Sequence, residues 1–452
     1  MSDVRGDLRD DGNQKRRPWT EVFRAFQIAL DPSKLILATA AVVVLWVGWW
    51  FLGLIFGQSG SPYSTWPGWV NRGKNPFMVV THPSEGHLFS AAFWFGGESK
   101  NPPAQLEPFQ KFFGPVIDII GSSPREGKWW YSLFGLFYTL AVWSIFGGAI
   151  TRIASVQFAR REKLSMSDGI RFARQKFWSF FTAPLIPLLG IAGLGILMIL
   201  GGLLLHIPII GDWLVAILWF LPLIAGLIIA LLVIGYIGWP LMYATVSSEG
   251  TDSFDALSRC YAYVYQRPWQ YLLYAALAVF YGFIAVFFMV FITSFMVYLA
   301  KWGVDLIPWH GWRGDPLSTL FIYAPTSYEW RTLLGGDQKD LKPEWFQSFG
   351  AGIVAIWLHS IFLFVLGFAY SFFWSAGTVV YFLMRKQVDD TELDEVYLED
   401  EDMAVAFSAP LGNEPNTLPI SGSGAGNDLG NANKPASTET SGGASGASPG
   451  NG

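Results

Sequence analysis

Long apolar runs alternate with shorter polar stretches along the chain, and the length of the runs predicts membrane-spanning helices. A spanning helix needs about 20 mostly apolar residues, because each residue rises about 1.5 Å against a hydrocarbon core of about 30 Å. Six runs qualify: Leu35 to Phe56, Tyr131 to Ile150, Ser179 to Leu205, Trp213 to Tyr243, Trp269 to Ala300 and Gly350 to Met384. Pro222 and Pro240 predict kinks in the fourth run, or its extension beyond the lipid. We therefore expect an all-α polytopic membrane protein with about six transmembrane helices.

Three polar segments that precede spans have the period of amphipathic helices. Their apolar rows are Phe23, Phe26 and Leu30; Ile170, Ala173 and Phe177; and Phe254, Leu257, Tyr261 and Val264. The pairs Ser165/Asp168 and Asp252/Asp255 have capping-box spacing, so a side-chain oxygen can accept from a free backbone N–H at each helix start. Such helices rest in the headgroup layer of a bilayer. We expect three interfacial helices.

Each amphipathic helix comes before two spans, and this order predicts three tandem units. The units cover about 19–157, 165–247 and 252–386, each a surface helix followed by an out-and-back pair. A simpler interpretation remains open, since amphipathic helices commonly lead into membrane spans without any duplication.

Basic residues mark the cytoplasmic side, because Lys and Arg are enriched in short cytoplasmic flanks. Seven lie between the second and third spans: Arg152, Arg160, Arg161, Lys163, Arg171, Arg174 and Lys176. Others precede the first span and follow the sixth, whereas 206–212 has none. These flanks predict a bacterial inner-membrane (cytoplasmic-membrane) protein with both termini in the cytoplasm.

The predicted domains follow from this topology. Residues 1–33 form a cytoplasmic tail that includes the first amphipathic helix, and 34–386 form the six-helix domain with extracytoplasmic loops at 57–130 and 301–349. Residues 387–452 form a cytoplasmic tail: an acidic run at 389–402, interpreted as a solvated spacer or a partner-binding segment, and a low-complexity part from 403 that we expect to be disordered.

The composition agrees with lipid as the solvent. Charged residues make up 14% of the chain, against about 25% in globular proteins. The net charge of −5 comes largely from the acidic tail and does not indicate nucleic acid as a partner. Cys260 is the only cysteine, which excludes an intrachain disulfide and a CxxC pair.

Candidate chemistry is sparse. The first five predicted spans contain no Asp, Glu, Lys, Arg or His, and the sixth contains only His359, either an intramembrane polar site or an imidazole hydrogen-bonded within the bundle. In the first outer loop, His82, Glu85 and His87 are of types that bind zinc, but their spacing matches no metalloprotease motif and the alternative is solvated loop residues. No GxSxG, GxGxxG after a strand, or P-loop occurs, so we expect no enzyme and no cofactor.

Glycines cluster in three of the predicted spans. They are Gly190, Gly193, Gly195, Gly201 and Gly202, with Gly147-Gly148 and Gly235-Gly238 elsewhere. Glycine allows close helix contact, and a lipid or apolar-ligand groove is the alternative interpretation.

The cytoplasmic helices carry a resemblance. DGIRFARQKFW and DALSRCYAYVYQRPW share an acidic residue, small or apolar residues, an arginine and an aromatic entry into a span. This pattern is similar to bacterial multi-pass inner-membrane families, including the membrane domain of some glycerophosphodiester phosphodiesterases. It covers at most 150–390 and implies no catalytic residue; Asp168, Arg171, Asp255 and Arg259 are the residues it draws attention to.

Two functions follow as hypotheses. The first is a non-enzymatic scaffold or assembly factor that acts on membrane or envelope components, with the lipid bilayer and other membrane or envelope proteins as partners. The second is a transporter or flippase for an apolar or amphipathic substrate. An outer-facing metalloenzyme is a third hypothesis and requires His82 and His87.

Overall fold

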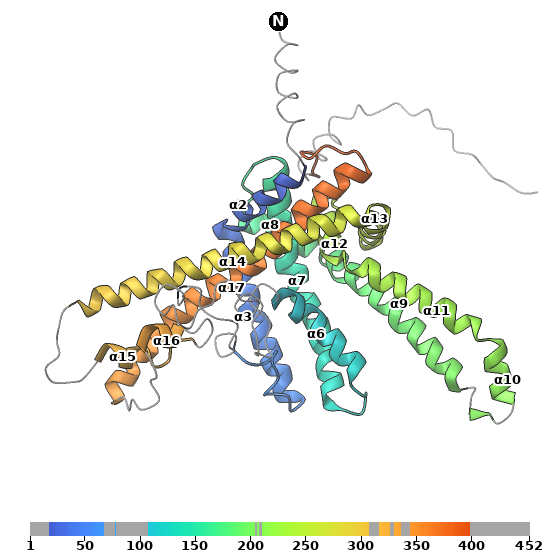
Figure 1. The fold of residues 1–452 in the computed structure, drawn as a ribbon, viewed down its shortest axis with the longest axis horizontal. Helices are drawn as coiled ribbons and strands as arrows, with labels where there is room; N and C mark the ends of the chain where they lie inside the picture. Colours follow the sequence, from blue (N-terminus) through green and yellow to red (C-terminus); the bar gives the residue numbers. More distant parts are fainter. Residues whose placement is uncertain are drawn as a thin grey trace, which may run out of the picture. The chain divides into compact units, whose positions relative to one another are not determined.

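The computed structural model describes residues 18–66, 77, 107–203, 206–207, 210–306, 316–325, 330–335 and 344–397. Within these ranges the regular structure is helical. The elements, labelled as in Figure 1, are η1 (Pro18–Phe23), α2 (Arg24–Ala29), α3 (Pro32–Ile55), α6 (Glu107–Gly121), α7 (Gly127–Ala159), α8 (Met166–Gln175), α9 (Phe177–Leu203), α10 (Ile210–Ile217), α11 (Phe220–Tyr236), α12 (Trp239–Glu249), α13 (Ser253–Gln266), α14 (Pro268–Asp305), α15 (Pro316–Leu320), α16 (Trp330–Gly335) and α17 (Trp345–Val388).

The predicted spans are confirmed as helices. Five helices are long and apolar enough to cross a membrane, namely α3, α7, α9, α14 and α17. The pair α11 and α12, bent by 60° at the break between them, passes the same test as a unit, so the described residues hold five spans, or six where this pair is counted as one. Pro240 stands in the first turn of α12, where its missing N–H breaks no hydrogen bond, so the predicted kink falls just before it. The fold is an all-α polytopic membrane protein.

The observed helices are longer than the predicted spans and include charged residues at their ends. Lys34, in the first turn of α3, and Arg152, in the last two turns of α7, are both buried. Arg152 donates to the Ser247 carbonyl at 2.8 Å, and its guanidinium lies 4.3 Å from the centre of the Phe172 ring. The expectation that the spans are free of ionisable groups therefore holds only for their central parts.

The second helices of the three predicted hairpins, α7, α12 and α17, pack against one another. Their contact is aromatic: the ring of Trp374 on α17 lies 5.5 Å from Trp143 on α7 and 4.6 Å from Tyr243 on α12. Gly147 makes room for this, since a Cβ there would lie 2.9 Å from the Trp374 ring. Nearer the ends of these helices, the hydroxyls of Thr151 and Ser247 share a hydrogen bond of 2.5 Å between α7 and α12.

The same packing recurs in all three predicted units, in cyclic order. Each short amphipathic helix contacts the second hairpin helix of the preceding unit: α8 lies on α7, α13 on α12, and η1 with α2 on α17. In two of the three units the first span also packs on the second hairpin helix of the preceding unit. These contacts are α9 on α7 and α3 on α17. The third pair, α14 and α12, makes no comparable contact. Whether duplication produced this arrangement stays a prediction.

The predicted helix caps are confirmed. The Ser165 side chain accepts from the Asp168 N–H at 3.2 Å, and the Asp252 side chain accepts from the Asp255 N–H at 2.9 Å. Pro268 then begins α14 directly after Arg267, as the Pro268-Trp269 pair predicts.

The buried faces of the amphipathic helices differ in part from the predicted apolar rows. Ala173 and Val264 are buried as predicted, but Phe23, Leu30 and Phe254 are exposed. Small residues take their place against the bundle, because they let the backbones approach more closely: a Cβ on Gly169 would lie 2.9 Å from Ile153. The buried sets are Val22, Ala25, Ile28 and Ala29; Gly169, Phe172 and Ala173; and Ala256, Cys260, Tyr263 and Val264.

The glycine prediction is right for two clusters and wrong for most of the third. Cβ atoms on Gly148 and Gly238 would meet Phe180 at 2.8 Å and Val264 at 2.7 Å. In contrast, Gly193, Gly195, Gly201 and Gly202 of α9 have no atom within 4 Å of such a Cβ. This part of α9 exposes apolar side chains, and these four glycines lie at no close helix contact in the described residues.

Two parts of the predicted outer loops are packed. Residues from Glu107 onward in the LEPFQKFFGPVIDII run lie in α6, whose Phe112 stacks on Trp239 with 3.8 Å between ring centres. Trp330 of α16 is buried and donates to the Ser294 hydroxyl on α14 at 3.0 Å, whereas Trp302 and Trp345 are exposed.

Candidate functional site

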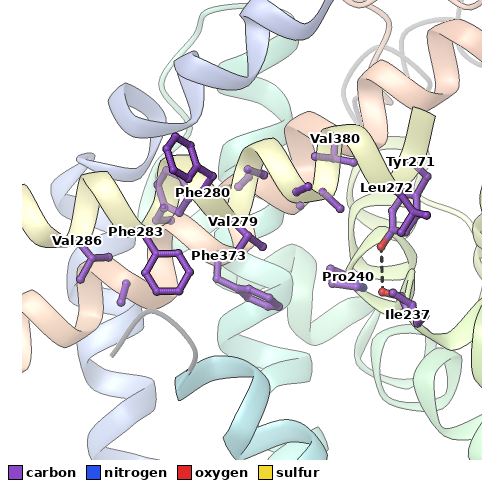
Figure 2. A pocket seen from close by; sticks show the side chains of 18 of the residues that line it. Ile237, Pro240, Tyr271, Leu272, Val279, Phe280, Phe283, Val286, Phe373 and Val380 are labelled. Atoms are coloured by element: carbon purple, nitrogen blue, oxygen red, sulfur yellow. Dashed lines mark hydrogen bonds between the residues drawn. The ribbon is translucent and has the colours of Figure 1, made fainter. Parts of the chain in front are cut away.

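A large groove lies between α12, α14 and α17, and we call it the apolar groove. Its volume is about 940 Å³. It is lined by Ile237, Pro240 and Leu241 at the start of α12, by residues of α14 between Tyr271 and Val286, and by residues of α17 between Ala369 and Val380. Figure 2 shows these side chains turned toward a common space.

Small side chains create the groove. Ala275, Ala276 and Ala278 on α14 and Ala376 and Gly377 on α17 all line it. Where α14 crosses α17 the contact is close, since a Cβ on Gly282 would lie 2.8 Å from Phe372. The apolar groove therefore lies beside the close crossing of α14 and α17. It occupies the space where α14 makes no comparable contact with α12.

The groove offers almost no polar chemistry. Among its side chains only Tyr271 has a hydrogen-bonding group, and its hydroxyl donates to the Ile237 carbonyl at 2.9 Å, the dashed line in Figure 2. No side chain that lines it can act as an acid, a base or a metal ligand. The groove can hold an apolar chain, because such a chain needs no hydrogen-bond partner there.

A second feature is a cluster of charges around Glu249 at the end of α12, which we call the Glu249 cluster. Glu249 forms ion pairs with Arg385 of α17 at 3.3 Å and with Arg259 of α13 at 3.1 Å, and accepts a hydrogen bond from Tyr381. Both Glu249 and Arg385 have about a tenth of their side chains exposed. Breaking a pair at this burial leaves an uncompensated charge, so the cluster fixes how the ends of α12, α13 and α17 meet.

The start of the acidic run belongs to this cluster. Tyr263 donates to Asp389, the Tyr397 N–H donates to the Ser248 carbonyl at 2.8 Å, and Arg385 donates to the Glu395 carbonyl at 2.9 Å. Residues 389–397 are therefore fastened to the bundle, unlike the solvated spacer expected over 389–402. The unit that contains the bundle ends at Tyr397.

The four residues singled out on the amphipathic helices lie in two separate pairs. Asp255 and Arg259 pair at 3.1 Å within the Glu249 cluster. Burial opposes the charge of Arg259, but the carboxylates of Glu249 and Asp255 outweigh it and raise the pKa of this guanidinium above its ordinary value. Asp168 and Arg171 pair at 3.2 Å on the exposed face of α8, away from both features. The sequence patterns do not single out Glu249, Arg385 or Tyr381, because these residues lie within the predicted spans or close to the ends of those spans.

His359 lies in α17, where its Nδ1–H donates to the Ala355 carbonyl one turn earlier at 2.8 Å. Its ring centre lies 6.2 Å from that of Trp66. His82, Glu85 and His87 lie outside the described residues. In the part of the chain that is described, no three His, Cys, Asp or Glu side chains gather as a metal site would require.

Comparisons with protein-family models, with curated proteins and with solved structures gave no match. The resemblance to phosphodiesterase membrane domains stays a prediction, and any function must be argued from the groove and the clusters themselves.

Proposed function

We propose that this chain is a non-enzymatic protein of a bacterial cytoplasmic membrane, with both termini in the cytoplasm, that binds the apolar part of a lipid or amphipathic substrate and carries it as a transporter or flippase. The observation that carries the proposal is the apolar groove, a hollow of about 940 Å³ lined by spanning helices. Inside a bilayer the available occupant of such a hollow is an acyl chain, because no water reaches it and empty space forfeits dispersion contacts.

The side chains that line the groove favour an apolar ligand over a polar one. Its side chains are aliphatic and aromatic, and its single hydroxyl is engaged with the backbone. A polar solute would lose its hydrogen bonds with water and find no replacement there, at a penalty of several kcal/mol. A hydrocarbon chain loses nothing by comparison with the lipid around it.

A groove-filling substitution tests the proposal. Ala276→Trp places an indole into the hollow, whereas Ala300→Trp adds the same group to an exposed position near the other end of α14. We expect Ala276→Trp to lower the phospholipid retained per protein in mild detergent by about tenfold, equivalent to about 1.4 kcal/mol. Native mass spectrometry counts the retained lipid, and proteoliposomes with a fluorescent lipid measure movement between leaflets.

The two variants separate groove binding from general effects on the fold. Ala300→Trp should keep wild-type lipid retention and lipid movement. Equal lipid retention in both variants, or lipid movement no faster than in protein-free vesicles, would contradict the proposal.

The scaffold hypothesis keeps one supporting observation. Residues 389–397 are bonded to the Glu249 cluster immediately before the segment 398–452, so a partner held by that segment would be tied to the transmembrane bundle.

A further inference from the structure

A second cavity lies between α2 and the end of α7, and its lining is basic. It has a volume of about 330 Å³ and is lined by Arg24, Gln27, Ile28, Gln157 and Arg161. Two guanidinium groups and two carboxamides therefore face one space. We propose that this basic cavity binds a phosphate group, and specifically the headgroup phosphate of an anionic lipid.

The orientation of Gln157 ties the cavity to a fully buried lysine. The ammonium of Lys34 donates to Gln157 Oε1 at 2.6 Å, and Gln157 Nε2 donates to Asp31 Oδ2 at 3.2 Å. The side chain of Gln157 thus lines the cavity and joins Lys34 to Asp31 through these two hydrogen bonds. These two hydrogen bonds fix the orientation of Gln157 at the wall of the cavity.

The two arginines play different roles. Arg24 pairs with Glu21 at 2.9 Å, donates to the Phe158 carbonyl at 3.3 Å and stacks over the Phe158 ring, so its position is fixed and its charge is partly neutralised. Arg161 makes no ion pair or hydrogen bond with the other described residues. It follows α7 with a φ of 60°, a left-handed conformation that turns the chain beside the cavity. Arg161 is the group with its charge available to a ligand.

The surroundings point to a lipid as the source of the phosphate. Trp19 and Phe23, on the segment that leads into Arg24, expose about two fifths of their side chains, as expected of residues at headgroup depth. Basic pockets between spanning helices on the cytoplasmic side bind anionic headgroups, and planar guanidinium groups bind phosphate oxygens in pairs. The cavity has room for about ten water molecules at about 30 Å³ each, enough for a phosphate with attached glycerol.

The test compares lipid selection by three proteins in nanodiscs of phosphatidylcholine containing one fifth phosphatidylglycerol. We expect the wild type to enrich phosphatidylglycerol over its bulk fraction, measured by native mass spectrometry of ejected protein–lipid complexes. Arg24→Gln with Arg161→Gln should lower this enrichment by about fivefold or more, since each basic residue near an anionic surface contributes about 1 kcal/mol. Arg171→Gln with Arg174→Gln, which removes two charges from exposed positions on α8, should keep it.

The single variant Arg161→Gln controls for misfolding of the double variant. Arg24 packs on Phe158, so its loss can disturb the fold, whereas Arg161 supports no described contact. The single variant should fold as the wild type does in pure phosphatidylcholine and still lose enrichment. If millimolar inorganic phosphate displaces phosphatidylglycerol and binds equally well in pure phosphatidylcholine, the phosphate chemistry stands and its source is soluble. Equal enrichment in the cavity variants and the α8 variant would overturn the proposal. The outcome is independent of the apolar groove, which Ala276→Trp tests separately.

Discussion

The single cysteine shows how the fold determines the chemistry of one residue. Cys260 is fully buried in α13, and its Sγ donates to the Gly238 carbonyl at 3.0 Å. Burial raises the pKa of its thiol above the ordinary value of about 9, so it stays protonated and unreactive in the folded protein.

This shift predicts a dependence of stability on pH. An unfolded thiol ionises above its ordinary pKa while the folded thiol does not, so the folded state is fully favoured below about pH 9 and loses about 1.4 kcal/mol per pH unit above it from this group. The unfolding temperature of the wild type should therefore fall more steeply between pH 9 and 10 than that of Cys260→Ala. Parallel slopes for the two proteins would show that the thiol titrates normally.

At the residue scale, the sequence predicts what depends on near neighbours in the chain. The caps at Ser165 and Asp252 were predictable because acceptor and donor are three residues apart. The burial of Cys260 and Glu249 was not, because it depends on helices brought together from distant parts of the chain. For the same reason Phe254, which has the right period for a buried position, proves to be exposed by 69%.

At the scale of elements, long apolar runs predict spans reliably because the bilayer sets their length. The bend before α12 was predictable from Pro240, which cannot donate a backbone hydrogen bond. Glycine content was a poorer guide, since glycines lie at close contacts in α7 and before α12 but face open space over much of α9. Sequence alone does not say which glycine has a neighbour.

A matched pair of glycine substitutions tests this distinction. Gly238→Ala would place a Cβ 2.7 Å from Val264 and 3.0 Å from Cys260 Sγ, pushing α13 away from the start of α12. We expect a loss of about 1–3 kcal/mol of stability and faster maleimide labelling of Cys260. Gly193→Ala meets no atom and should be neutral or stabilise α9 by up to about 1 kcal/mol. Slow labelling in both variants would contradict the close contact.

At the scale of the whole molecule, the cyclic packing of the three units and the apolar groove could not be predicted. Both depend on which helices meet, and the groove arises because α14 does not close on α12 as α3 does on α17. The basic cavity was visible in sequence only as scattered arginines. Its lining joins Arg24 to residues more than a hundred positions away.

The boundary after Tyr397 gives a prediction for the full chain. A chain ending at Tyr397 keeps every described contact of the Glu249 cluster and should unfold at the wild-type temperature, whereas a chain ending at Val388 should lose about 1–3 kcal/mol. If the scaffold hypothesis holds, partners that co-purify with the full chain are lost from the first truncation. Equal stability of the two truncated chains would show that residues 389–397 do not fasten the bundle.

Protease accessibility of a C-terminal tag tests the proposed cytoplasmic location of the C-terminus. A C-terminal tag on the full chain should resist protease added to intact spheroplasts and be cut in inverted vesicles. Cleavage in spheroplasts would place the tail outside the cell and contradict the proposed topology.

The contact of α2 with α17 also sets an order of events during synthesis. The Ser371 hydroxyl donates to the Ala29 carbonyl at 2.8 Å, so α2 gains this contact only after α17 has been made, whereas its contact with α7 can form earlier. Until α17 is made, the Ala29 carbonyl lacks this donor. A nascent chain interrupted before α17 therefore lacks the helix on which η1, α2 and α3 pack.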